Sequence, residues 1–397
     1  MASGTSISTT LGSSDRPSRH AGLDWLRVFA TLGVLTLHAG IAYMPHPLPG
    51  LRWAAHDTPT AWADAICWPL DAWVMPVFFL LGGMAAATLL DRLGPGDMAR
   101  HRVRRLGGPL LLGCVLILPL DLYVWLLGAA ADGSLPLRKL QSLKLKGYDD
   151  GLWGPSHLWF LQYLLLYCLA AAAIRARRPL PLRIDPLRER RTMAAAIAAS
   201  IAALAIEPRI LIGFRHHPLP QWENAVFFAA FFLVGLRRPA AAWSRGKAVA
   251  WLTLGGLSLA AAWPMMVGQW ATLASGDSTP LAIRVPLAAC FGLACWGLGL
   301  GSLEMARTIR RPLPSSLRRV AAAAFWIYLL HHPVVGLAQV GLKPMAMPSA
   351  AKFALVAAIG LAIPMLSYPL VVRGRWIGRV LGEKPAPKPQ PALRSAA

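Results

Sequence analysis

An arginine and a histidine lie within the first hydrophobic stretch of the chain, as Arg27 and His38 in GLDWLRVFATLGVLTLHAGIAYM, residues 22–44. Their spacing of eleven residues is about three helical turns, so a helix presents both on one face, roughly 16 Å apart along its axis. An imidazole exchanges protons near neutral pH. A charge near the centre of a bilayer costs about 2.5–3.5 kcal/mol, so such residues usually face an interior cavity and serve a function. We take this pair as the nucleus of a candidate site.

Two further groups of ionisable residues follow on the next hydrophobic segments. Asp71 and His38 each lie about six residues from the end of their own segment, so antiparallel packing places them at similar depth. Arg102 and Arg105 directly precede the third segment, together with Arg104. Guanidinium groups at this density suit phosphate binding, because they make paired hydrogen bonds to phosphate oxygens. The alternative is that these arginines only mark the cytoplasmic side.

Aromatic and histidine side chains occur on two later segments. His157 and Trp159 begin the fourth segment, where an interfacial aromatic belt is the alternative to a binding role. His331 lies about eleven residues into the segment AAAAFWIYLLHHPVVGLAQV and is followed by His332 and Pro333. A single buried histidine is more often a hydrogen-bonded core residue. The adjacent pair before a proline favours a functional role for His331.

The elements that must position these residues are hydrophobic helices. Of 397 residues, 56% are hydrophobic and only 15% are charged, and the apolar residues form runs of about twenty. This pattern predicts an all-α, polytopic membrane bundle of about ten transmembrane helices, which forms one domain over residues 21–381. Polar tails at 1–20 and 382–397 are predicted to be disordered and cytoplasmic. The ten predicted segments are 23–44, 65–90, 106–127, 157–174, 192–207, 222–236, 248–267, 281–303, 320–340 and 352–372.

The net charge of +22 is explained by membrane topology rather than by a function in nucleic-acid binding. Of the 40 lysines and arginines, 29 lie before the first segment or after every second one, and nine lie in the alternate loops, counting Lys352 at the very start of the last segment. Arg27 and Arg284 lie within segments. This alternation is the positive-inside pattern, which places both termini in the cytoplasm. The five cysteines all fall within predicted segments and lack metal-ligand spacing, so we expect neither a disulfide nor a metal site.

The N-terminal region also has some features of a signal peptide, since two arginines precede an apolar core that is followed by small residues. Arg27 abuts this core, and nine further segments follow, which favours an uncleaved first helix. The distinction matters because cleavage would remove His38.

The chain resembles acyltransferase family 3, a family of integral membrane proteins. The similarity is carried by LDWLR with His38 eleven residues after Arg27, PVFFLLGG at 76–83, the Arg102-x-x-Arg105 pair, SHLWFL at 156–161 and FWIYLLHHP at 325–333. PVFFLLGG and SHLWFL are similar to the branch that includes the periplasmic glucan succinyltransferases. Where the family often has a serine, this chain has Gly82, which leaves close helix packing as the role of Gly82 and Gly83.

The resemblance implies a multi-pass protein of the bacterial inner membrane that transfers an acetyl or succinyl group from acyl-CoA to a hydroxyl of a carbohydrate or lipid-linked acceptor outside the cytoplasm. No tightly bound cofactor is expected. His38 would act as the base, oriented by Asp71, or as a nucleophile that forms an acyl-imidazole. Arg27, Arg102 and Arg105 would bind the donor's phosphates, and His157, Trp159 and His331 would contact substrates. A solute transporter is the alternative, although no internal repeat is found.

Overall fold

The computed structural model describes residues 21–48, 53–136, 154–178, 185–208, 218–237, 244–275 and 277–382. Within these ranges the chain is helical with short connections and contains no strand, which confirms the all-α prediction. The predicted tail 1–20 lies outside the described residues, as does 382–397 apart from Gly382.

The helices are α1 (Ala21–Ile41), α2 (Ala61–Arg102), α3 (Gly108–Leu112), α4 (Leu118–Ala131), α6 (Trp159–Arg177), α7 (Pro186–Ile206), α8 (Trp222–Arg237), α9 (Arg245–Gly268), α10 (Trp270–Ser275), α11 (Leu281–Arg307), α12 (Ser315–Leu342), α13 (Ser349–Ser367) and α14 (Trp376–Val380). Short π-helical turns η1 (Val103–Gly107), η2 (Gly113–Ile117) and η5 (Tyr368–Val372) continue α2, α3 and α13, and a 3₁₀ turn, η3 (Ser156–Leu158), precedes α6.

Each of the ten predicted hydrophobic segments coincides with helical structure. Among the described residues, six helical stretches are long and apolar enough to cross a membrane, and one of them, Ala61–Ala131, contains two predicted segments. The protein is therefore a multi-pass membrane protein. The number of ten spans and the cytoplasmic side of the termini stay predictions.

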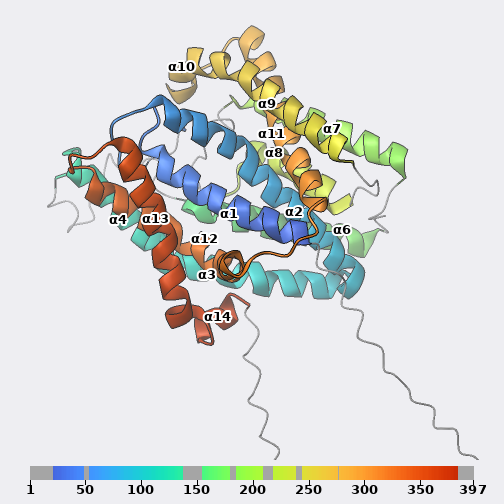
Figure 1. The fold of residues 1–397 in the computed structure, drawn as a ribbon. Coiled ribbons are helices and arrows are strands. Elements are labelled where there is room, and N and C mark those ends of the chain that lie inside the picture. The colour runs from blue at the N-terminus through green and yellow to red at the C-terminus, as the bar shows by residue number, and fades with distance from the viewer. Residues whose placement is uncertain are drawn as a thin grey trace, which may run out of the picture.

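The chain turns back within the stretch from α2 to α4. Gly94 has φ 75° and ψ 173°, outside helical geometry, and Pro95 follows it. Glycine adopts positive φ without a steric penalty, and proline suits the first turn of the helix that follows. Figure 1 shows α2 running in one direction across the bundle and the cyan segment through α3 running back toward α4. This turn brings α4 beside α12.

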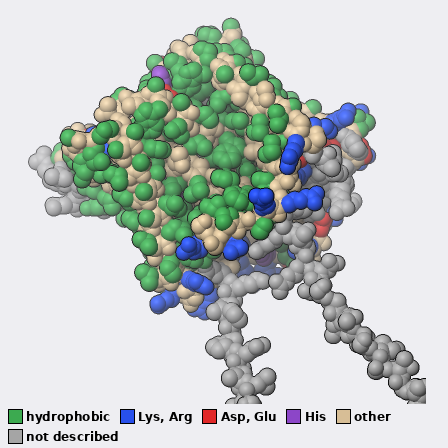
Figure 2. All heavy atoms as spheres, viewed as in Figure 1, with side chains coloured by type: hydrophobic (Ala, Val, Ile, Leu, Met, Phe, Trp, Pro, Cys, Tyr) green, Lys and Arg blue, Asp and Glu red, His purple; other side chains and the backbone are tan. Residues whose placement is uncertain are grey.

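Helix α1 and helix α2 lie in the middle of the bundle, with α12 and α13 on one side and α7, α9 and α11 on the other (Figure 1). The surface suits lipid contact, since Leu111, Leu257 and Leu366 are each at least two-thirds exposed. Figure 2 shows a broad hydrophobic face with Lys and Arg gathered along one edge, which includes the region of α14. This separation of charge from apolar surface is typical of a membrane protein.

Two glycines let α2 and α8 approach closely. A Cβ atom at Gly83 would lie 2.1 Å from the carbonyl oxygen of Phe232, and one at Gly235 would lie 2.1 Å from that of Leu80. Backbone atoms cannot move aside as a flexible side chain can. The predicted role of Gly83 in helix packing is therefore present in the structure, and small residues serve this role in membrane bundles generally.

Replacing Gly83 with alanine should separate α2 from α8 and destabilise the bundle by about 1–3 kcal/mol through overpacking. The measurement is the midpoint of thermal unfolding in detergent, which should fall. Gly256→Ala is the matched control, because a Cβ there meets no atom within 4 Å. An unchanged midpoint for Gly83→Ala would contradict the observed packing.

Candidate active site

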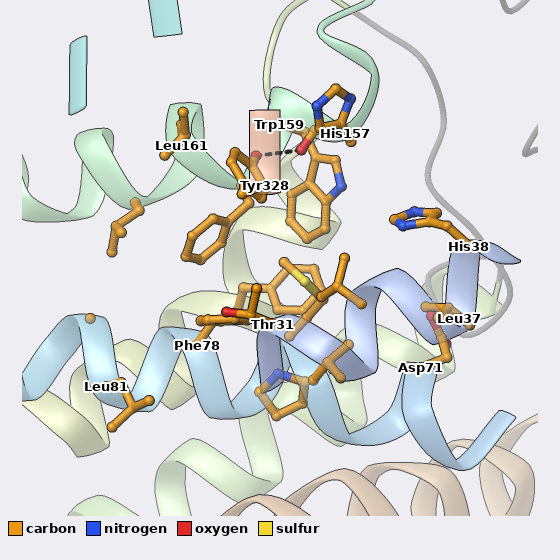
Figure 3. A pocket seen from close by; sticks show the side chains of 18 of the residues that line it. Thr31, Leu37, His38, Asp71, Phe78, Leu81, His157, Trp159, Leu161 and Tyr328 are labelled. Atoms are coloured by element: carbon orange, nitrogen blue, oxygen red, sulfur yellow. Dashed lines mark hydrogen bonds between the residues drawn. The ribbon is translucent and has the colours of Figure 1, made fainter. Parts of the chain in front are cut away.

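A cavity of about 370 Å³ lies between α1, α2, α6, α8, α11 and α12 (Figure 3). Its lining from α1 includes Arg27, Thr31, Val34 and His38, which recur every three or four residues and thus form one helical face. The spacing of Arg27 and His38 predicted this shared face. The volume is in the range of small-molecule sites.

A chain of hydrogen bonds fixes the proton on the ring of His38. Nδ1 of His331 lies 2.9 Å from the carbonyl oxygen of Ile327 and 2.8 Å from that of Tyr328. Carbonyl oxygens only accept, so Nδ1 of His331 donates, and in the neutral ring its Nε2 is an acceptor. Nε2 of His331 lies 3.0 Å from Nδ1 of His38, which must then be the donor. The Nε2 atom of His38 therefore carries the lone pair.

The ring of His38 is also held from the other side. The indole of Trp53 stacks on it with ring centroids 5.5 Å apart and an interplanar angle of 8°. Trp53 donates through Nε1 to Oε1 of Gln339 at 2.6 Å, and Gln339 donates through Nε2 to the carbonyl oxygens of His38 and Ala39. These carbonyls belong to the last turn of α1. His38 is thus positioned by two other segments of the chain, α12 and the connection that carries Trp53.

A second polar cluster is centred on Asp121 of α4. Its Oδ1 lies 2.8 Å from Nδ1 of His332, and its Oδ2 accepts from the hydroxyl of Ser156 at 2.6 Å and lies 3.4 Å from Nδ1 of His157. All four residues are buried. Asp121, His157 and His332 each offer one ligand atom within 4.8 Å of the others, so this group could hold a metal ion. The sequence-based expectation of no metal site rested on the spacing of the cysteines alone.

Sequence reasoning missed the part that Asp121 plays in this cluster. The signal that could have found it is an acidic residue inside the third apolar segment, because a charge within a membrane helix is usually functional. His332 was noticed only as the neighbour of His331. The contributions of Trp53 and Gln339 depend on packing across most of the chain and leave no local pattern.

Asp71 lines the same cavity as His38 but does not orient it. In the part of the chain that the structure describes, no hydrogen bond joins the two, and Nδ1 of His38 pairs with His331 instead. The reason is the packing of α12 along α1, which brings His331 to the ring nitrogen. In Figure 3 the imidazole extends from α1 toward the side of Trp159 and His157, while Asp71 approaches from α2.

His157 and Trp159 also line the cavity. The carbonyl oxygen of His157 accepts from the hydroxyl of Tyr328 at 2.6 Å, the contact dashed in Figure 3. Trp159 packs against Phe79 and Phe228 of neighbouring helices, with ring centroids 6.1 and 5.0 Å away. Trp159 therefore lies inside the bundle rather than in a belt on its surface.

The three predicted phosphate-binding arginines lie in different surroundings. Arg27 lines the cavity, pairs with Asp24 at 3.2 Å and has a half-exposed side chain. Arg102 is buried, yet its Nε and Nη2 atoms have no hydrogen-bond partner in the described chain. Arg105 donates to the carbonyl oxygen of Leu381. Neither Arg102 nor Arg105 is among the residues that line the cavity.

The arrangement is suited to proton transfer at a small, largely apolar cavity inside a membrane bundle. No curated protein and no solved structure matches the chain at a significant level. A family model described as an acyltransferase domain matches residues 20–368, a range that includes His38, the Asp121 cluster and every helix that lines the cavity. The chain therefore belongs to acyltransferase family 3 and is a membrane acyltransferase.

Proposed function

We propose that the protein transfers an acetyl or succinyl group from acyl-CoA to a hydroxyl of a glycan outside the cytoplasm, in the inner membrane of a bacterium. The observation that carries this proposal is the hydrogen-bond chain from the carbonyl oxygens of Ile327 and Tyr328 through His331 to His38. It leaves an unprotonated Nε2 on a half-buried imidazole that lines the cavity. An acyl transfer to a hydroxyl needs such a base.

In the proposed reaction, Nε2 of His38 takes the proton from the acceptor hydroxyl. The oxygen adds to the thioester carbonyl, and a C–O bond forms. The C–S bond then breaks, and the thiolate leaves with the proton returned by the imidazolium. His331 remains a neutral acceptor for Nδ1 of His38 throughout, so one proton moves in and the same proton moves out.

The donor's phosphates require cationic partners, and Arg102 is suited to this role. A buried guanidinium with two unpartnered nitrogens is costly unless an anion satisfies it. Helix α6 connects this end of the bundle to the cavity, since Arg102 interacts electrostatically with Cys168, one turn beyond the cavity-lining Leu164. A thioester arm could follow α6 from Arg102 to His38.

Replacing Arg102 with lysine should raise the KM for acyl-CoA about tenfold and change kcat much less, because lysine keeps the charge and loses the paired contact. The measurement is initial rate against acyl-CoA concentration for purified protein. Arg104→Lys is the matched control, since Arg104 is an exposed neighbour on η1. An unchanged KM for Arg102→Lys would remove Arg102 from donor binding.

The acyl group and the acceptor can be identified together. Envelope glycans from a strain that lacks the gene are compared by mass with those of the parent strain. We expect a loss of 42 or 100 mass units, about the added mass of an acetyl or a succinyl ester, restored when the gene is returned. Identical glycan masses in the two strains would reject the glycan acceptor.

A further inference from the structure

One carboxyl group inside the cavity has no role in the reaction proposed above. Asp71 of α2 lines the cavity and is partly exposed to it, and its carboxyl makes no hydrogen bond or ion pair with any other residue that the structure describes. Two acids that are buried elsewhere in the bundle, Asp64 and Asp121, each have a histidine partner at 2.8 Å. An unpartnered polar group inside a fold is costly, so Asp71 is suited to contact a ligand.

Contacts between α1 and α2 locate Asp71 along the cavity. Cys67, one turn before Asp71, has its Sγ atom 3.7 Å from the carbonyl oxygen of Leu37. Val74, three residues after Asp71, lies beside Gly33, since a Cβ atom at Gly33 would be 3.0 Å from its Cγ1 atom. Asp71 is therefore level with the part of α1 between Gly33 and Leu37.

This level determines how far Asp71 lies from the reactive ring. The middle of the stretch 33–37 is about one helical turn, roughly 5 Å, from His38 along the axis of α1. The displacement is toward Arg27, which lies at the other end of the face that α1 presents to the cavity. A donor whose thioester carbonyl meets Nε2 of His38 and whose phosphates lie toward the arginines must therefore pass Asp71.

The pantetheine arm of acyl-CoA carries an amide N–H group at a matching distance. Its nitrogen is four bonds from the thioester carbonyl carbon, through the sulfur and two CH2 groups, which is roughly 5 Å in an extended arm. An N–H group that moves from water into an apolar cavity needs an acceptor. Among the residues of α2 that line the cavity, only Asp71 has a polar side chain, and Val74, Met75 and Phe78 follow it. The carboxyl of Asp71 is the side-chain acceptor that α2 offers to this N–H group.

We propose that Asp71 binds the acyl-CoA donor by accepting a hydrogen bond from the amide N–H nearest to the sulfur of its pantetheine arm. This inference rests on the function proposed above. A carboxyl oxygen accepts such a bond whether or not the group carries a proton, so the role requires no particular charge on Asp71. No covalent bond forms or breaks at Asp71. The contact holds the thioester at the level of His38 and recognises the arm rather than the acyl group.

The test uses two pairs of donors: acetyl-CoA, succinyl-CoA and the analogue of each in which a CH2 group replaces that N–H. Thiol release by detergent-purified protein is measured with envelope glycan from the deletion strain as acceptor. We expect the unmodified protein to favour each natural donor over its analogue by about 10–100-fold in kcat/KM, because the analogue covers the carboxyl without giving it a hydrogen bond. The difference should lie mainly in KM, since the contact is made in the ground state and the transition state alike.

Asp71→Leu should lower kcat/KM for the natural donors by about tenfold or more and leave kcat/KM for the analogues undiminished, because leucine gives the N–H no acceptor but tolerates a CH2 group. Asp71→Asn should keep the preference, since the amide oxygen of asparagine can accept the same bond. Asp91→Leu is the matched control, because Asp91 is an exposed acid of α2 that does not line the cavity. If Asp71→Leu does not fold, Asp71→Ala takes its place and should lose the preference in the same way.

Three results would overturn the inference. Equal use of each natural donor and its analogue by the unmodified protein would show that no residue recognises the N–H group. An equal loss with natural donors and analogues in Asp71→Leu would place Asp71 in acceptor binding or in the packing of the cavity. A preference for the natural donors that survives in Asp71→Leu would assign the N–H group to another residue.

His38→Gln in the same assay separates this inference from the proposed function. If the unmodified protein releases no thiol from either acyl-CoA, or if His38→Gln releases it at the unmodified rate, the proposed function fails and the inference fails with it. If thiol release depends on His38 but each natural donor and its analogue are used equally, the function stands and the role of Asp71 is wrong.

Discussion

Replacing His38 with glutamine is expected to reduce glycan acylation in cells to the level of the deletion strain, while the protein remains inserted in the membrane. The reason is that glutamine has no basic nitrogen, and a positioned general base contributes about 10²–10⁴-fold to the rate. The fold should persist, because Gln339 holds the end of α1 through the backbone carbonyls of His38 and Ala39 rather than through the imidazole.

The measurement for His38→Gln is the mass of extracted glycans from the complemented deletion strain, with the amount of membrane protein checked by immunoblot. His56→Gln is the matched control, since His56 is exposed and does not line the cavity. Normal acyl content in cells that carry His38→Gln would remove His38 from catalysis.

Replacing His331 with phenylalanine should lower kcat by about two orders of magnitude. Phenylalanine keeps an aromatic ring between α12 and α1 but cannot accept the hydrogen from Nδ1 of His38. The His38 ring would then lose the contact that selects its tautomer, and the basic lone pair would no longer be confined to Nε2.

His331→Gln is the informative companion variant, because the carbonyl oxygen of glutamine can accept from Nδ1 of His38. We expect it to retain clearly more activity than His331→Phe, with similar KM values for acyl-CoA in both. These rates are measured on purified protein of equal thermal stability. Equal kcat for the two variants would mean that the hydrogen bond to His38 does not set its reactivity.

The sequence predicted most of the helices and one face of the cavity. Long apolar runs are sufficient to place helices, and the helical repeat alone brings Arg27 and His38 to one face of α1. The family membership was also predicted from the sequence, because its motifs are short runs of residues that occur in a recognisable order. The membership that those motifs indicated is confirmed over residues 20–368.

The partners of His38 could not be predicted in the same way. The His38–His331 hydrogen bond joins residues 293 positions apart, and the His332–Asp121 contact joins residues 211 positions apart. Asp71 was predicted as the partner of His38 from its similar depth in the membrane. Depth gives a position along the bilayer normal, but it does not determine which helix lies alongside. The choice between Asp71 and His331 is made by the packing of α12 against α1.

The most direct test of the central claim measures thiol release by purified protein given acyl-CoA and envelope glycan from the deletion strain. We expect the unmodified protein to release one thiol for each acyl group found on the glycan, and His38→Gln to release thiol at the background rate. Thiol release by His38→Gln at the rate of the unmodified protein would contradict the assignment of His38 as the reactive base.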